Sequence, residues 1–255
     1  MNKTKIFFNP NVKLRNPIML VGLPGIGSIG ALVCENIRNE LNAKRFATLY
    51  SPYLPHQVLM LKSGSMRLLS NRFYYWKNPS KDKDANDIVI LLGDAQAVSS
   101  KGQYEISETI VKFFKSLGGK KIFTIGGYSV SEKYIKNPRV YGVSPSRELR
   151  AELKKHGVIF GSTVGMIWGA AGLIVSFAKK HRIESGCLLG ETGFLEVDAN
   201  SARSVLNVIN GLLGTKISTD NLEKIKKETE AMLSRFEELT KDEQKQSTEN
   251  LTYIR

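Results

Sequence analysis

One local pattern restricts the fold of this chain more than any other feature: an apolar run that ends at glycine and leads to a helical stretch. Such runs are residues 18–22, 87–93 and 121–126. A short apolar run bounded by glycine is typical of a buried strand. Because these runs alternate with helical stretches, we predict an α/β fold with a mostly parallel central sheet.

The expected elements follow from the same periodicity. Strands are expected at 18–21, 46–50, 58–62, 66–69, 73–76, 87–92, 121–125, 158–160 and 187–189. The three runs between 58 and 76 are separated by short Ser-containing turns, which predicts antiparallel hairpins. Helices are expected at 29–41, 104–117, 146–156, 164–180 and 198–213. Ser28 and Asp198 stand at helix starts, where their side chains suit an N-cap.

Residues 158–178 carry no charged side chain over 21 positions. That length is enough to span a membrane, and glycines at 161, 165 and 169 resemble a helix-packing stripe. The competing interpretation is a short strand, a Gly-Ser-Thr turn and a buried helix. We favour the second interpretation and expect no membrane contact, because the stretch is glycine-rich, lacks a second span and lies within the α/β alternation.

The C-terminal part differs from the rest in composition. We expect one α/β domain over 1–218, a helix over 219–240 and a flexible tail over 241–255. A three-four spacing predicts a short coiled-coil seam or a helix face that lies on the domain; it comprises Leu222, Ile225, Thr229, Met232, Phe236 and Leu239. Tyr253 and Ile254 follow a polar tether, which fits either a docking tail or a frayed terminus.

The net charge is strongly basic. The chain carries 37 Lys and Arg against 24 Asp and Glu, a formal charge of +13. This excess invites a nucleic-acid interpretation. The charge is spread, however, with +15 over residues 1–218 and −2 over residues 219–255. Because no basic tract, zinc finger, helix-turn-helix or RNP-like motif is present, we expect a solvated basic surface and no nucleic-acid partner.

Cysteine and histidine are too few for a disulfide framework or a metal centre. The two cysteines, Cys34 and Cys187, fall within predicted core elements, and the three histidines are scattered at 56, 156 and 181. We therefore expect no metal and no cofactor. The N-terminal residues lack an apolar core followed by small residues, so we expect no secretory signal and a cytoplasmic protein.

The sharpest local motif is Gly25-x-Gly27-x-x-Gly30, which follows a predicted strand and opens a predicted helix. That context suits a dinucleotide-binding loop, whose backbone N–H groups hold a phosphate. Pro24 removes one donor from the turn, and no acidic ribose ligand stands about 20 residues further on. The competing interpretation is close packing of strand on helix. Gly25, Gly27, Ser28 and Gly30 are thus the candidates for a ligand loop.

Carboxylates follow two predicted strands, at the edge where sites form in α/β sheets. Asp94 suits an acid or base, or a cap of the following turn, and Glu191 joins it as a candidate ligand residue. Asp198 is explained more simply as an N-cap. No Gly-x-Ser-x-Gly motif and no other catalytic constellation is present, so we expect a protein without enzymatic activity.

Several short segments carry a further signal through their order. The first is residues 20–30, Leu-Val-Gly-Leu-Pro-Gly-Ile-Gly-Ser-Ile-Gly. The others are 92–96, 124–128, 161–173, 188–193 with Asp198, and the end of a helix at 212–214. This ordered set, over about residues 17–235, resembles the proteasome assembly chaperone 2 family in its archaeal branch.

The resemblance implies a phosphorylase/hydrolase-like three-layer sandwich with a C-terminal helical extension, a homo-oligomer, and no established catalytic activity. Archaeal members are similar to factors that help assemble the proteasome α-ring, which implies proteasome α-subunits as partners. Some of them dock a tail that ends hydrophobic residue-Tyr-any residue. Here the last residues are Tyr253, Ile254 and Arg255, with the tyrosine one place early. The alternative function is a nucleoside- or phosphate-binding enzyme or sensor that uses the glycine loop and the strand-end carboxylates.

Overall fold

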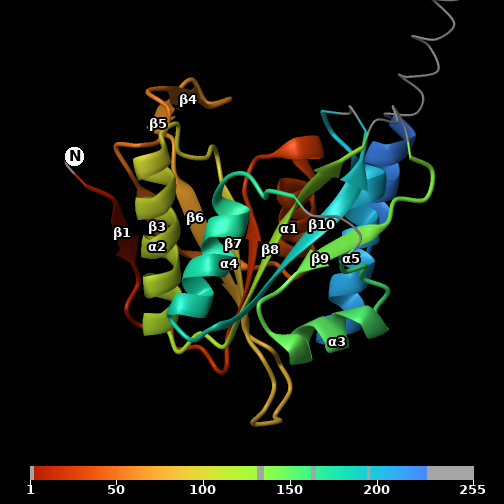
Figure 1. Cartoon of the computed structure of the whole chain (residues 1–255). Helices are drawn as coiled ribbons and strands as arrows, with labels where there is room; N and C mark the ends of the chain where they lie inside the picture. Colours follow the sequence, from red (N-terminus) through yellow and green to blue (C-terminus); the bar gives the residue numbers. More distant parts are fainter. Residues whose placement is uncertain (1–2, 131–134, 162–164, 194–195, 229–255) are drawn as a thin grey trace, which may run out of the picture.

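Eight strands form one sheet in the computed structural model, which describes residues 3–130, 135–161, 165–193 and 196–228 (Figure 1). The strand order is β1-β3-β6-β7-β2-β8-β10-β9. The strands are β1 (Lys5–Phe8), β2 (Ile18–Gly22), β3 (Lys44–Tyr50), β6 (Asn71–Trp76), β7 (Ile88–Gly93), β8 (Lys121–Ser129), β9 (Val140–Val143) and β10 (Glu184–Thr192). A separate hairpin consists of β4 (Val58–Met60) and β5 (Met66–Leu68).

The centre of the sheet is parallel, as predicted, and its flanks are antiparallel. β7, β2, β8 and β10 run parallel to one another. Antiparallel pairs add β6, β3 and β1 on one side and β9 on the other. Every residue of β2 is buried, which is the burial expected of a central strand that is covered on both faces.

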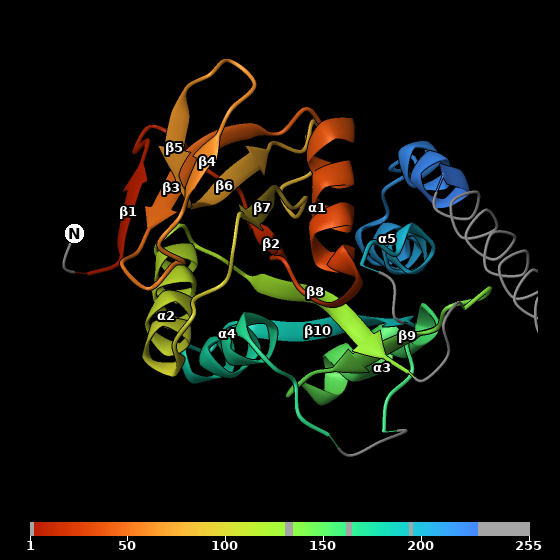
Figure 2. The same cartoon turned by 90° about the horizontal axis from the view of Figure 1, so that it is seen from above.

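Helices cover both faces of the sheet, which makes the predicted three-layer sandwich (Figure 2). One face carries α1 (Ile29–Glu40), α3 (Arg147–Lys155) and α5 (Ala199–Leu213), and the other carries α2 (Ser100–Ser116) and α4 (Ala170–Lys180). Alternate residues of β2 divide between the two cores: Leu20 packs with α1 and α5, whereas Met19 and Val21 pack with α2 and α4. Successive side chains of a strand point to opposite faces, so one apolar run supplies both cores.

Helix starts differ from the predictions where a cap or a glycine decides the boundary. α2 begins at Ser100, earlier than predicted, because the Ser99 side chain accepts a hydrogen bond from the N–H of Gly102 (3.2 Å). α4 begins later than predicted, at Ala170, after Gly169 with a φ of 80°. A left-handed glycine interrupts a helical backbone, so the prediction of a helix from residue 164 is wrong.

The strand predictions miss both edges of the sheet. β1 and β9 are short and partly exposed, so they lack the continuous apolar run that marks a buried strand. The predicted strand over 158–160 is wrong, since Ile159 makes only an isolated parallel bridge to Tyr141. Of the three runs predicted to form hairpins, β4 pairs with β5, whereas β6 joins the large sheet between β3 and β7.

The uncharged stretch 158–178 is buried within the domain in its C-terminal part. Its C-terminal part belongs to α4, where Ile174 and Ala178 are fully buried in the core that α4 shares with α2. Among the described residues, no helix is long and apolar enough to cross a membrane.

The described part of the C-terminal helix, residues 220–228, packs on the domain. Leu222 is buried and belongs to the core of α1 and α5. Glu223 forms an ion pair with Arg203 of α5. The rest of the predicted seam and the tail, residues 229–255, lie outside the described residues, and the division into domain, helix and tail stays a prediction.

Contacts along this segment give its direction. Asn210, near the end of α5, donates a hydrogen bond to the carbonyl of Ile217 (2.9 Å), whereas Arg203, nearer the start of α5, pairs with Glu223. Residues 220–228 therefore run antiparallel to α5. They lead back to the edge of the sheet where β10 ends and α5 begins (Figure 1).

The closest contact of the parallel centre joins β2, α1 and β8 through their backbones. A Cβ at Gly22 would overlap the carbonyl oxygen of Gly30, and a Cβ at Gly30 would overlap the carbonyl oxygen of Ile125. Neither glycine has a positive φ, so the proximity of backbone atoms, and not conformation, requires glycine here. This contact holds the start of α1 against the end of β8.

Gly30→Ala is expected to lower the free energy of unfolding by about 1–3 kcal/mol, because the added methyl must displace backbone atoms. Urea unfolding followed by far-UV circular dichroism measures the change. Gly165→Ala is the matched control, since no heavy atom lies within 4 Å of its added Cβ. Equal unfolding midpoints for the two variants would contradict the packing role.

Candidate binding site at the carboxyl edge of the sheet

The carboxyl ends of β2 and β8 mark the point where the chain leaves the sheet in opposite directions. From β2 the chain passes through α1 to β3 on one side of the sheet order, and from β8 it passes to β9 and β10 on the other. Neighbouring parallel strands with diverging connections leave a crevice at their carboxyl ends, where ligands of open α/β sheets usually bind.

A cavity of about 600 Å³ lies at this crevice, and it originates from a missing side chain. On the face of β8 that packs under α4, the Thr124 hydroxyl donates a hydrogen bond to the carbonyl of Ala171 (3.1 Å). The next residue on that face is Gly126, where an added Cβ would meet only the Leu189 side chain within 4 Å, at 3.3 Å. Because α4 begins only at Ala170, no helix of the described ranges covers Gly126.

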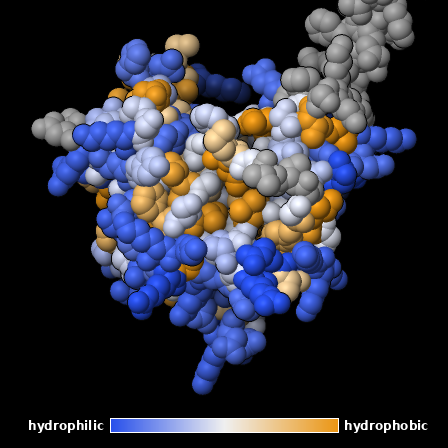
Figure 3. All heavy atoms as spheres, viewed as in Figure 1, coloured by the Kyte–Doolittle hydropathy of each residue, from blue (hydrophilic) through white to orange (hydrophobic). Residues whose placement is uncertain are grey.

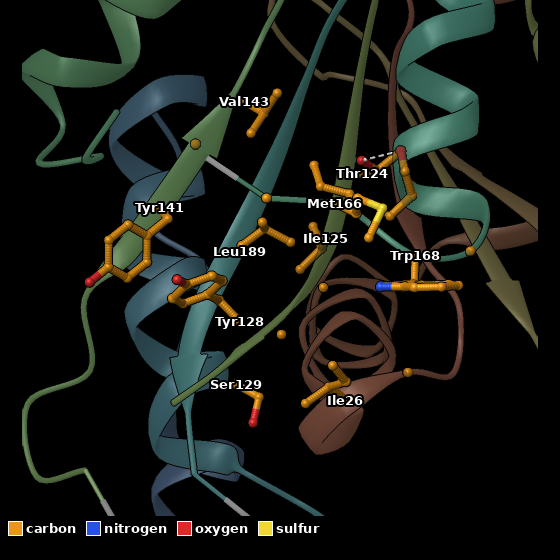
Figure 4. A pocket seen from close by; sticks show the side chains of 18 of the residues that line it. Ile26, Thr124, Ile125, Tyr128, Ser129, Tyr141, Val143, Met166, Trp168 and Leu189 are labelled. Atoms are coloured by element: carbon orange, nitrogen blue, oxygen red, sulfur yellow. Dashed lines mark hydrogen bonds between the residues drawn. The ribbon is translucent and has the colours of Figure 1, made fainter. Parts of the chain in front are cut away.

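Aromatic and aliphatic side chains form the walls of the cavity (Figure 4). Tyr128 and Tyr141 lie on one side, with their ring centroids 4.9 Å apart. Trp168 lies on the opposite side, with Leu189 and Ile125 between it and the two tyrosines. The cavity is therefore a mainly apolar space between two aromatic walls.

Three large apolar side chains at the rim of the cavity are exposed. Trp168 is 82%, Met166 80% and Ile26 53% exposed. Contiguous exposed apolar residues mark interaction sites more often than isolated ones do. The sequence carries a signal for two of them, since Met166 and Trp168 lie in the uncharged stretch but precede the buried helix.

The polar groups of the cavity are few and uncharged. Among the described residues that line it, there is no Asp, Glu, Lys, Arg or His. The Gln96 amide is already engaged, since it donates to the Pro24 carbonyl (2.7 Å) and accepts from the Ala170 N–H (3.0 Å). The Tyr141 hydroxyl donates to Glu191 (3.2 Å); burial, and next the charge of Glu191, raise the pKa of Tyr141. A charged ligand would therefore lose hydration here without meeting an oppositely charged side chain among the described lining residues.

The candidate ligand loop lies only partly at the cavity. Gly25 lines it, whereas the Gly27 carbonyl accepts a hydrogen bond from the Asp198 N–H (2.9 Å). Ser28 has a positive φ of 52° and its side chain makes no hydrogen bond to α1, so the prediction that it caps this helix is wrong. Gly30 lies in the contact between α1 and β8. Gly30 thus packs α1 against β8, and the role of the motif as a ligand loop stays a prediction.

Asp94 is held by two arginines at the end of β7. Its carboxylate accepts hydrogen bonds from Arg67 (2.5 and 2.9 Å), from Arg72 (2.7 Å) and from the Ser70 N–H (3.0 Å). Burial alone would raise the pKa of Asp94, but the bonds from Arg67 and Ser70 and the charge of Arg72 outweigh it and lower the pKa. Asp94 therefore stays ionised and connects the end of β7 to the hairpin through its ion pair with Arg67. It does not cap a turn.

Glu191 is engaged in a similar way at the end of β10. It is 4% exposed and accepts hydrogen bonds from the Arg139 guanidinium (2.5 Å at the shortest) and from the Arg139 N–H (3.1 Å). These bonds from Arg139 lower the pKa of Glu191. Asp198 caps α5, as predicted, by accepting a hydrogen bond from the Ser201 N–H (2.8 Å). Neither Glu191 nor Asp198 lines the cavity.

The hairpin of β4 and β5 presents a second apolar surface, which sequence reasoning missed. Val58, Met60, Met66 and Leu68 form two cross-strand pairs on one face and are 55–85% exposed. Figure 3 shows hydrophobic residues at this hairpin, at the top of the view. Arg67, on the other face, forms the ion pair with Asp94. The alternation of apolar residues on both strands was visible in the sequence. Whether another segment covers their side chains was not.

The cysteines and the tail give no site among the described residues. Cys34 and Cys187 are buried, and burial raises the pKa of both thiols, that of Cys187 to about 11. Within the described ranges, no three His, Cys, Asp or Glu side chains are arranged to hold a metal ion. Tyr253, Ile254 and Arg255 lie outside the described residues.

Asp94→Asn is expected to lower the free energy of unfolding by about 1–3 kcal/mol at neutral pH, because both arginines lose their charged partner. Since the folded-state pKa of Asp94 is lowered, its stabilisation is complete above about pH 4 and is lost as the pH falls through the folded-state pKa. Urea unfolding at neutral and acidic pH measures both limits.

The exposed Glu35 provides the matched control for this pair. Glu35→Gln breaks a surface ion pair with Arg38 and is expected to cost less than about 0.5 kcal/mol. A difference between wild type and Asp94→Asn that stays constant down to acidic pH would show that the charge of Asp94 is not the cause.

Comparison with known proteins places this architecture in a family. The model of the PAC2 family matches residues 19–237. An uncharacterized protein of Methanocaldococcus jannaschii is 35% identical over 247 residues, which are 94% of this chain and 93% of that protein. The crystal structure of Pyrococcus furiosus PbaB, an archaeal proteasome activator, is similar with a TM-score of 0.86 and 36% identity, over 93% of this chain and 100% of that chain.

A second solved structure supports the same assignment. Pyrococcus furiosus PbaA, an archaeal homolog of proteasome-assembly chaperone, is similar with a TM-score of 0.76 and 25% identity, over 99% of this chain and 100% of that chain. The three-layer sandwich, the order of the glycine-containing segments and the match over most of the length agree. The chain belongs to the PAC2 family.

Proposed function

We propose that this chain is a non-enzymatic, homo-oligomeric protein-binding factor that acts on the α-ring of the 20S proteasome, as an archaeal proteasome assembly chaperone does. Support comes from the similarity over nearly the whole chain to PbaB and PbaA, which are described as a proteasome activator and a homolog of a proteasome-assembly chaperone. The agreement extends over the full length of both proteins and is not confined to one motif.

The observation that carries the proposal is the chemical character of the carboxyl edge. An enzyme of this architecture would place reactive groups there. Instead, Asp94 and Glu191 are bound by arginines. Large exposed apolar side chains lie at the same edge, with Met60 and Trp168 more than 80% exposed. Exposed aromatic and methionine side chains are enriched in protein interfaces, which favours binding over catalysis.

The C-terminal helix supports a role for the tail. Leu222 and the ion pair between Glu223 and Arg203 fix the described end of this helix to the domain. From residue 228 a further 27 residues follow, and they end with Tyr253 and Ile254 behind a polar stretch. A tether on a fixed base raises the effective concentration of its terminal residues near the bound partner.

The charge distribution fits an acidic partner. The body of the chain, residues 1–218, carries a net charge of +15. Opposite charge on the partner would steer association and would make its rate dependent on salt. This contribution acts beside the apolar contacts of the carboxyl edge and does not replace them.

A second candidate function has the same partner. The similarity to PbaB, with 36% identity, exceeds that to PbaA, with 25% identity. This difference favours action on the assembled proteasome as an activator, in addition to action on free α-subunits. Peptide hydrolysis by the assembled 20S particle, with and without the chain, separates the two, since only an activator raises the rate.

The full-length chain is expected to retain archaeal proteasome α-subunits in a pull-down, and a chain truncated after Asn250 is expected to retain less. The truncation removes only Leu251 to Arg255, so the folded domain stays intact as a matched control. No retention by either chain would contradict the proposed partner. Equal retention by both chains would contradict only the role of the tail and would leave the proposed partner in place.

The chain is expected to be a homo-oligomer in solution. Light scattering coupled to size-exclusion chromatography should give the mass of two or more copies of the 28.4 kDa chain. Met60→Ser combined with Met66→Ser tests whether the apolar face of the hairpin holds the copies together, because both side chains are more than 70% exposed. A monomer mass for the wild-type chain at micromolar concentration would refute the oligomer.

A further inference from the structure

We propose that the cavity at the carboxyl ends of β2 and β8 binds a neutral, mainly apolar small molecule that carries an aromatic ring. The cavity shares Trp168 with the carboxyl edge on which the proposed protein-binding role is argued, but the proposal does not depend on that role. The proposal follows from the size, the walls, the charge and the rigidity of the cavity.

The size and the position of the cavity suit a small molecule. Its volume of about 600 Å³ lies within the range of about 300–1,000 Å³ that is usual for ligand pockets. It lies where the connections of β2 and β8 diverge, and the ends of parallel strands supply its floor. A flat protein surface would not need a hollow of this depth.

The walls select for a ring. Tyr128 and Tyr141 form a tilted pair on one side, and Trp168 stands on the other (Figure 4). Aromatic rings interact favourably with a further ring at centroid distances of about 4.5–7 Å. Leu189 and Ile125 between the walls offer aliphatic contacts. A planar apolar molecule would therefore contact both walls and the floor.

The electrostatics select for neutrality. The described lining residues include no charged side chain, and the Thr124 hydroxyl and the Gln96 amide both have hydrogen-bond partners already. A phosphate or carboxylate that entered the cavity would lose hydration without meeting a positively charged side chain among the described lining residues. The chemistry of the cavity thus favours a neutral ring over a nucleotide.

The Gln96 side chain fixes the distance between two segments that border the cavity. The Gln96 amide joins the Pro24 carbonyl in the loop after β2 to the Ala170 N–H at the start of α4, at 2.7 and 3.0 Å. Gly126 has no side chain that could collapse into the space. A preformed cavity binds more tightly, because little ordering is left for the ligand to bring about.

The test is a titration of the full-length Trp76→Phe variant with N-phenyl-1-naphthylamine, a neutral aromatic probe. This background leaves Trp168 as the single tryptophan of the chain. We expect saturable binding of one probe per chain, with an increase in probe emission and quenching of Trp168. The anionic relative 8-anilinonaphthalene-1-sulfonate is expected to bind at least about tenfold more weakly.

Two variants test the position of the probe. Gly126→Val fills the cavity and is expected to weaken binding at least about tenfold. Trp168→Ser removes one aromatic wall and, in the chain that retains Trp76, is likewise expected to weaken binding. The Trp168 side chain is so exposed that folding does not depend on it. Phe7→Ser in β1, an exposed apolar residue that does not line the cavity, is the matched control and is expected to leave the affinity unchanged.

Several results would overturn the proposal. They are an absence of saturable binding, equal affinity in wild type and in both cavity variants, a loss of affinity in Phe7→Ser, and equal affinity for the anionic probe. Binding that appears only after truncation at Asn250 would also overturn it, since the occupant would then be the chain's own tail. None of these results would alter the outcome of the pull-down.

Discussion

The backbone contact between β2, α1 and β8 is the constraint on which the carboxyl edge depends. Gly22 and Gly30 allow the start of α1 to lie directly on the sheet, next to the carbonyl of Ile125. Since β2 and β8 are neighbours with diverging connections, this contact also sets one side of the crevice. This packing accounts for Gly22 and Gly30, and the cavity, which Gly25 lines, lies beside them.

The charged groups of this edge position segments and are not free to react. The ties of Asp94 to Arg67 and of Glu191 to Arg139 each join a central strand to a less regular neighbour. Breaking such a pair leaves a buried charge without its partner, which is costly. The hairpin is thereby held beside the sheet, and the residue before β9 is held against β10. Exposed apolar side chains such as Trp168 lie at the same edge, and this arrangement favours the proposed binding role.

The cavity and the exposed rim are features that stability alone does not favour. An unfilled space loses the contacts that a side chain would make, and glycine in a strand adds a conformational cost. A larger residue at position 126 would recover much of both. The exposure of Trp168 likewise leaves a large apolar surface in water. Occupancy by a ligand or partner would offset these costs.

Sequence patterns alone determined the parallel centre and the order of most elements, because buried strands and amphipathic helices leave local patterns, whereas the three layers were implied by the family resemblance. It also identified the Asp198 cap, whose partner lies three residues away. Tertiary structure alone decided the partners of Asp94 and the open space above Gly126. Those outcomes depend on which distant segments meet: Arg67 reaches Asp94 from a hairpin, and α4 starts too late to cover Gly126. Local periodicity does not predict such contacts between distant segments, since these contacts follow from strand order and from the lengths of the connections.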